Sequence, residues 1–246
     1  MSFLNCDFSY KHYFETLNIA KKTYEILPIG KYENCKKIDN FILLRHDIDF
    51  SLDAALELAK LESKNKIFST YYILLHSNFY NALSETGKKF IKKISSLGHE
   101  IGLHYDTNFL SSNQEEAKNQ LEYELSILSS ITNKKILTAV AHNPSLNSNS
   151  KFQLPENIID PMSKKLLNDT LYISDSTQNW RNKCMCAHIN NKSKLQILTH
   201  PIWWSKESSN RIQNMNFVLN SNFIQNKSEI NKMIKIQNNS LSSRKV

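Results

Sequence analysis

Two acidic residues stand at the end of an apolar stretch in the first quarter of the chain. Four apolar residues (41–44) lead through Arg45 into His46-Asp47-Ile48-Asp49. Side chains alternate between the two faces of a strand, so we expect Asp47 and Asp49 to point the same way. Two carboxylates held that close repel each other unless a metal ion or a shared proton relieves them. The pair therefore predicts a functional site, with helix capping as the plainer alternative.

Further acids and imidazoles recur where other predicted strands end. They are His76, His104, Asp106, His142, Asp175 and His200. The carboxyl ends of parallel strands gather at one mouth when the strands curl into a barrel. Asp and His together suit zinc or a similar divalent ion. A hydrolytic metal centre also needs an open position for water, a base, and an acid for the leaving group, and this set contains candidates for each.

The elements that must position these residues alternate between strand and helix. We expect helices over 10–27, 51–63, 85–97, 114–130 and 208–235, and strands over 41–49, 67–75, 99–106, 136–141, 170–174 and 195–199. Ser51 is the expected N-cap of the second helix. Residues 145–168 contain two prolines and are expected to form an irregular excursion with a short helix. The alternation predicts parallel βαβ units, and hence an α/β fold.

The composition is that of a soluble globular protein. The 246 residues fit one large domain, and 40% hydrophobic with 22% charged residues is ordinary for such a chain. No run of about 18 apolar residues exists, so we expect no membrane span. The N-terminus lacks the basic and apolar regions of a secretory signal, which predicts a cytoplasmic location. Four cysteines are too few and too scattered for a disulfide framework.

The formal net charge of +8 raises the question of an anionic partner. Residues 206–246 hold seven Lys or Arg against two Glu, which gives 7 − 2 = +5 in a segment rich in Asn and Ser. We interpret this segment as a solvated basic extension and expect no nucleic-acid partner. The end of the chain from Asn238 is expected to be disordered.

Several segments, taken in chain order, resemble the polysaccharide deacetylase superfamily, the nodulation-type or family-four carbohydrate esterases. The segments are His46-Asp47-Ile48-Asp49, Thr70-Tyr71-Tyr72, Gly98-His99-Glu100-Ile101-Gly102-Leu103-His104, His142-Asn143-Pro144, Ser174-Asp175 and Leu198-Thr199-His200-Pro201. The Gly-His-Glu-Ile-Gly segment with its following His is the most specific of them. The resemblance divides the chain into an N-terminal helix and connection (1–40), a deacetylase-like barrel (41–204) and the basic C-terminal extension (205–246).

The resemblance implies a distorted or incomplete (β/α) barrel that uses a divalent metal ion to remove acetyl groups from N-acetylated sugars. It implies that Asp47 is the catalytic base and His104 the first metal-binding histidine. It also implies that His200 protonates the leaving amine and that Asp175 orients His200.

This chain departs from the family pattern at two ligand positions. The family's metal-binding second Asp falls on Ile48, and its second metal-binding His falls on Asn108. Asp49, on the same strand face as Asp47, is the expected substitute for the first. His142 stands where the family usually has an Arg that orients the base. We therefore expect a variant triad of Asp49, His104 and His142, with Asp106 and Asn108 left open as alternative third ligands.

The function expected from the sequence is metal-dependent hydrolysis of an N-acetyl group on a carbohydrate, with zinc the first choice of metal. The expected substrate is an N-acetylated sugar or a glycan intermediate. Two alternatives stay open: a deformylase or other amide hydrolase on the same fold, and a catalytically inactive domain that binds a sugar or a partner.

Two further features carry plainer interpretations. Trp203 and Trp204 follow His200, and we expect them to pack at the barrel rim rather than to stack against a sugar. Cys184-Met185-Cys186-Ala187-His188 suggests a metal site, but zinc sites usually pair two such clusters and the sequence contains no second one. We therefore do not expect this segment to bind a metal.

Overall fold

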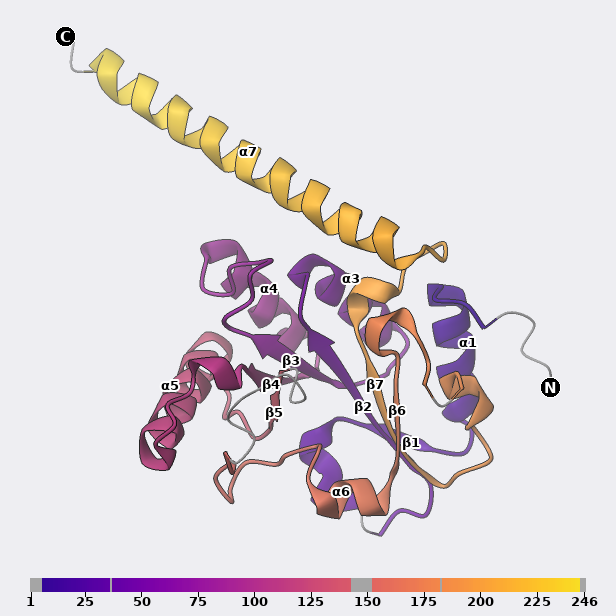
Figure 1. Cartoon of the computed structure of the whole chain (residues 1–246). Coiled ribbons are helices and arrows are strands. Elements are labelled where there is room, and N and C mark those ends of the chain that lie inside the picture. The colour runs from indigo at the N-terminus through magenta and orange to yellow at the C-terminus, as the bar shows by residue number, and fades with distance from the viewer. Residues whose placement is uncertain (1–5, 36, 143–151, 182, 244–246) are drawn as a thin grey trace.

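A parallel β-sheet runs through the middle of the molecule (Figure 1). The computed structural model describes residues 6–35, 37–142, 152–181 and 183–243. The strands in these ranges are β1 (Glu25–Leu27), β2 (Phe41–Ile48), β3 (Thr70–Leu74), β4 (Glu100–Tyr105), β5 (Ala139–Ala141), β6 (Leu171–Ser174) and β7 (Lys194–Thr199). Their order is β5-β4-β3-β2-β7-β6, and every pairing is parallel.

The sheet is curled but not closed. In the described residues β5 and β6 stand at the two ends of the strand order and do not pair with each other. β1 and β3 pair with the same edge of β2, one after the other along the strand. Leu27 of β1 lies opposite Leu43, and Thr70 of β3 lies opposite Arg45. The prediction of an incomplete (β/α) barrel is therefore confirmed. Because all strands are parallel, their carboxyl ends lie at the same edge of the sheet.

Helices cover the outside of this curled sheet (Figure 1). The longer ones are α1 (Tyr10–Ala20), α3 (Leu52–Lys64), α4 (Glu85–Ser96), α5 (Gln114–Thr132) and α7 (Arg211–Ser243). Short turns of helix are α2 (Tyr32–Cys35), α6 (Lys164–Asp169), η1 (Ile29–Lys31), η2 (Thr107–Phe109), η4 (Ser176–Gln178), η5 (Met185–Ala187) and η6 (Pro201–Trp203). Ser51 is the N-cap of α3, as predicted, and its hydroxyl accepts a hydrogen bond from the Ala54 N–H.

Two large apolar clusters hold these layers together. One joins α3, α4 and α5 to β3 and β4, with Tyr71, Leu103 and Leu121 fully buried. The other joins α1 to β2 and β7, and contains Tyr13 and both Trp203 and Trp204. The second cluster lies beneath the strand ends of β6 and β7, so α1 supports the side of the sheet that carries Asp175 and His200.

The predicted helix over 10–27 is wrong in its second half. α1 ends at Ala20, and Glu25 to Leu27 form β1 instead. Tyr24 and Leu27 continue the helical spacing of apolar residues, which is why the pattern misled. The short strand gains backbone hydrogen bonds by lying parallel to the start of β2, a long-range pairing that local spacing cannot reveal.

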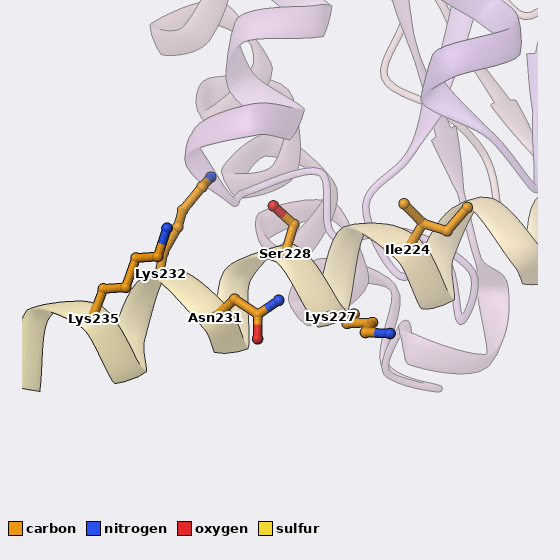
Figure 2. Close-up of a pocket in the computed structure, with 6 residues that line it drawn as sticks. All are labelled: Ile224, Lys227, Ser228, Asn231, Lys232 and Lys235. Atoms are coloured by element: carbon orange, nitrogen blue, oxygen red, sulfur yellow. The ribbon is translucent and has the colours of Figure 1, made fainter.

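The C-terminal helix is longer than its sequence predicts. Residues 211–243 form α7, so the chain is helical beyond Asn238, where we expected disorder. This stretch contains neither Gly nor Pro, and nothing in it stops a helix. Figure 1 shows α7 leaving the body of the molecule. Figure 2 shows its outer half, where Lys227, Lys232 and Lys235 are among the residues that line a hollow formed by α7 alone.

None of the helices in the described ranges combines the length and the apolar character that crossing a bilayer requires. The described residues exclude 1–5, 143–151 and 244–246, among others. Residues 145–151 of the predicted irregular segment (145–168) therefore lie outside them. Its predicted short helix is present as α6.

Candidate active site

The end of β2 brings three charged residues to one face. Arg45 and Asp47 lie two residues apart on the strand, and Asp49 follows in the bend after it. Arg45 and Asp47 are both buried, and an Nη atom of Arg45 lies 3.6 Å from Oδ2 of Asp47. Ile48 points the other way into the apolar cluster below α3. The pleat of β2 therefore excludes position 48 from the site and admits Asp49.

His104 comes from β4 and faces both acids. Its Nε2 lies 3.3 Å from Oδ1 of Asp49 and 3.8 Å from Oδ2 of Asp47. Its Nδ1 lies 3.1 Å from the Val140 carbonyl oxygen. A proton on Nδ1 donates to that carbonyl and leaves the Nε2 lone pair directed at the acids, as in histidines that bind metals.

His142 lies directly after β5 and completes a group of three. The ligand atoms of Asp49, His104 and His142 all lie within 4.8 Å of one another. The two imidazole rings meet edge to face, with centroids 5.1 Å apart. The backbone N–H of His142 donates to the Tyr105 carbonyl at 2.8 Å, which ties the residue to β4. These are the three residues whose convergence the sequence hypothesis required.

His200 and Asp175 form a tight pair next to this group. Nδ1 of His200 lies 2.7 Å from Oδ1 of Asp175, and the His200 backbone N–H donates to the same carboxylate. The other oxygen of Asp175 accepts from Nε1 of Trp204 at 2.8 Å. Nε2 of His200 faces the acids, 3.8 Å from Oδ2 of Asp49. Asp175 thus holds one ring nitrogen and leaves the other for chemistry.

The charges at the site are tightly coupled. Burial by itself would raise the pKa of Asp49, but the imidazoles of His104, His200 and His142 outweigh it and hold that pKa at about 2. Burial lowers the pKa of His104, yet Asp47 and Asp49 reverse the effect and raise it. For His200 burial is likewise outweighed, chiefly by Asp175, and the pKa rises to about 9. The carboxylates of Asp47, Asp49 and Asp175 therefore favour positive charge at this site.

The donor set fits a divalent metal ion. Oδ1 of Asp47 is buried without a hydrogen-bond partner in the described residues, and Oδ1 of Asp49 has only its ionic contact with His104. The pKa of His142 is lowered by burial and by His104, so its ring is kept neutral, as a ligand must be. One carboxylate and two imidazoles are a common protein ligand set for zinc, with the fourth position left for water.

The alternative third ligands fit less well. Oδ1 of Asp106 accepts from the Asn108 backbone N–H at 2.9 Å, and its Oδ2 lies 3.9 Å from Nδ1 of His142. Asp106 therefore lies within ionic contact of His142 but outside the group of three whose ligand atoms converge. Asn108 is exposed on η2.

Arg45 is the residue that sequence reasoning missed. It stacks between the rings of Tyr72 and Tyr172, with its guanidinium carbon 5.5 and 5.8 Å from their centroids, and it pairs with Asp47. Strand alternation was the available signal, since position 45 shares a face with position 47.

Other residues noted in the sequence serve the fold. His76 pairs with Glu124 at 2.8 Å, and the ring of His99 bonds the Ala59 carbonyl. Trp203 and Trp204 are each only 2% exposed, so both pack in the interior as expected. Gly102 is needed for packing, because a Cβ there would lie 2.4 Å from the Tyr72 ring.

Comparisons with known proteins return solved structures only. No family model matches the chain, and neither does any curated protein. A pseudoenzyme of carbohydrate esterase family 4 from Bacillus anthracis is 15% identical, with a TM-score of 0.42, over 76% of this chain and 62% of its own. The chain thus spans less than two thirds of that protein's length.

Two further structures are similar over more of their length. A family 4 carbohydrate esterase from Bacillus anthracis is 12% identical over 83% of both chains, with a TM-score of 0.43. The chitin deacetylase of Colletotrichum lindemuthianum is 17% identical over 73% of this chain and 81% of its own, with a TM-score of 0.40. Because the identities and TM-scores are low, the functional proposal depends on the geometry of the site.

Proposed function

We propose that this protein is a metal-dependent hydrolase that removes an N-acetyl group from a carbohydrate. The observation that supports it most is the approach of Asp49, His104 and His142, whose ligand atoms lie within 4.8 Å of one another beside Asp47 and the His200–Asp175 pair. A ligand set, a carboxylate with one free oxygen and an oriented imidazole at one edge of the sheet are the parts that amide hydrolysis needs.

Asp49, His104 and His142 would hold a divalent ion, with zinc the first choice for this donor set. When bound, such an ion lowers the pKa of a water molecule and polarises the acyl carbonyl. The Val140 carbonyl holds Nδ1 of His104, the ring nitrogen opposite to the one that faces the acids, which keeps the Nε2 lone pair directed at them. Asp106 lies 3.9 Å from Nδ1 of His142.

Asp47 acts as the general base. Its free Oδ1 can accept the proton of the attacking water, since no other group in the described residues uses that atom. Arg45 contacts Oδ2 and orients the carboxylate. The base is thus held at one oxygen and available at the other.

His200 acts as the general acid. Nδ1 donates to Asp175, and this carboxylate raises the pKa of His200 to about 9 against the effect of burial. At neutral pH the ring is therefore an imidazolium, and its Nε2 carries the proton that the departing amine nitrogen needs. Amines are poor leaving groups and depart only when protonated, which is why an amide hydrolase requires this residue. The N-acetylated sugar as substrate is carried over from the deacetylase motifs over residues 41–204.

The test is acetate release from a panel of N-acetylated sugars and their oligomers. Asp47→Asn is expected to lower kcat about 10²–10⁴-fold, as loss of a general base does. The matched control is Asp39→Asn, an exposed carboxylate outside the site, which should leave the rate unchanged. Release of formate or another acid in place of acetate would redirect the proposal to a different amide.

A catalytically silent sugar-binding domain is the second candidate. Ile48 and Asn108 replace two ligands of the family that the sequence resembles. Ile48 is buried in the apolar core, and Asn108 is exposed. This candidate predicts sugar binding with no divalent ion bound at Asp49 and no acid released from any substrate.

A further inference from the structure

A second group of side chains that could bind a metal ion lies outside the candidate active site. Cys6 precedes α1, His12 lies in its first turn, and Cys184 and Cys186 flank the start of η5. The three sulfur atoms and one imidazole nitrogen all lie within 4.8 Å of one another. The two halves of the group are 172 or more residues apart in the chain.

The contacts inside the group resemble those between ligands of one ion. Nε2 of His12 lies 3.2 Å from Sγ of Cys184, and Sγ of Cys6 lies 3.3 Å from Sγ of Cys186. In a tetrahedral zinc site with bonds of about 2.0–2.3 Å, neighbouring ligand atoms are roughly 3.4–3.8 Å apart. The four cysteines are all free thiols. A small adjustment of the side chains would therefore place all four donors around one cation.

The surroundings are those of a structural site. His12, Cys184 and Cys186 are buried, and only Cys6 is exposed. The backbone N–H of Cys186 bonds the Cys184 sulfur, an interaction that favours the thiolate.

Cys35 shows what an ordinary buried cysteine looks like in this protein. Its Sγ donates to the Lys31 carbonyl one helical turn earlier, and it belongs to neither group of potential ligands in the described residues. Free cysteines often fill apolar cores in this way. Three sulfurs and an imidazole nitrogen converging from two distant segments are a different arrangement.

We propose that Cys6, His12, Cys184 and Cys186 bind one zinc ion as a structural site. Three thiolates and one neutral imidazole fill all four tetrahedral positions, which leaves no place for substrate or water. Each thiol releases its proton to solvent as the ion binds. The site does not depend on the proposed hydrolase activity.

The position of this zinc site gives it a role in the fold. It clamps the segment before α1, and α1 itself, to the connection between β6 and β7. Tyr13 of α1 packs on Trp204, with ring centroids 4.9 Å apart, and Trp204 holds Asp175. The sequence did not predict this site, because Cys6 and His12 do not form a recognisable ligand motif. They also lie far in the sequence from the Cys184-Met185-Cys186 segment.

Cobalt substitution tests the proposal on the unaltered chain. Protein freed of metal and titrated with Co²⁺ is expected to develop the near-ultraviolet thiolate charge-transfer band and the intense visible bands of a tetrahedral centre, saturating at one equivalent. Cys184→Ser should remove these bands, whereas Cys35→Ser should leave them intact. Co²⁺ bound by carboxylate and imidazole at Asp49 gives no thiolate band, so the two sites are distinguishable.

Metal analysis supplies the second measurement. The double variant Asp49→Asn and His104→Ala, purified from zinc-containing medium, should still retain one zinc per chain. Its three clustered thiols should resist a thiol reagent until a chelator is added. The absence of a thiolate band in the unaltered chain, or a mass two hydrogens lower that shows a Cys6–Cys186 disulfide, would overturn the proposal.

Discussion

At the scale of single residues, the pleat of one strand explains how this site departs from the family pattern. Ile48 stands where a second Asp is expected, yet its side chain packs in the core below α3. Asp49 lies one residue later, in the bend after β2, and reaches His104 at 3.3 Å. The sequence allowed this substitution to be predicted, because alternation puts positions 47 and 49 on one face. The same alternation places Arg45 on the face that carries Asp47. The sequence alone does not show that the two side chains form an ion pair, which the structure reveals.

The His200–Asp175 pair yields a prediction about leaving groups. Asp175→Asn removes the carboxylate that receives the Nδ1 proton, so His200 loses both its orientation and its stabilised charge. We expect kcat on an N-acetylated sugar to fall about 100-fold or more with little change in KM. Hydrolysis of an activated acetate ester, whose phenolate leaves unprotonated, should fall far less.

Trp204→Phe is the control for that experiment. It removes the indole N–H that donates to Asp175 and keeps an aromatic ring in the packed interior. Its effect on the amide should stay below about tenfold, in line with the loss of one neutral donor. Equal losses on amide and activated ester in Asp175→Asn would show that His200 is not the general acid.

At the scale of elements, a buried carboxylate connects the helices to the sheet beneath the site. Glu62 of α3 accepts hydrogen bonds from Tyr13 of α1 at 2.5 Å and from Ser69 and Tyr71 near β3 at 2.7 and 2.8 Å. Nε2 of His46 on β2 lies 3.0 Å away. His46 points opposite to Asp47, so this network fixes β2 from the face that the site does not use. No local pattern in the sequence predicts it, since α1, α3 and the strands meet only in the folded chain.

Glu62 predicts a specific loss of stability in acid. Burial would raise its pKa, but His46, His99 and the Tyr13 hydroxyl outweigh it and lower the pKa from 4.5 to about 2. A depressed pKa in the folded state stabilises the fold above pH 4.5, and the contribution is lost as the pH falls from 4.5 to 2. The slope of unfolding free energy against pH over this range checks it.

Glu62→Gln should flatten that slope. It puts an amide donor among hydroxyl donors, and we expect it to cost about 3 kcal/mol at pH 7, as breaking a buried charged network does. Glu57→Gln, an exposed change on the same helix, should cost less than about 0.5 kcal/mol. A Glu62→Gln protein with unaltered stability and an unaltered acid slope would contradict the network.

At the scale of the whole molecule, the curled sheet gathers chemistry from five places in the chain. The ends of β2, β4, β5, β6 and β7 supply the acids and imidazoles of the site. This could be predicted, because a strand followed by a polar tip recurs along the sequence. The pairing of β1 with β2 could not, because it depends on a partner distant in the sequence. The full length of α7 was missed because the Asn- and Ser-rich end of the chain was interpreted as disordered, although no residue in it ends the helix.

The outer part of α7 is expected to be dispensable for folding. Residues 223–238 are exposed, and the hydrogen bonds from Asn222 to the Phe79 carbonyl and from Gln225 to Asp53 join the inner part of α7 to the body. A chain ending at Asn226 should keep its acetate release and its Tm within about 2 °C, because it loses no buried surface. A large fall in Tm would show that the outer helix packs on a part of the molecule in solution.

The most direct test of the account is anomalous diffraction from zinc-soaked crystals, collected on either side of the zinc edge. The account predicts a peak within bonding distance of Asp49, His104 and His142, with Asp47 close by but not bound to the ion, and this peak should vanish in His104→Ala. A map with no peak among these three residues, at a zinc concentration that fills other sites, would contradict the central claim.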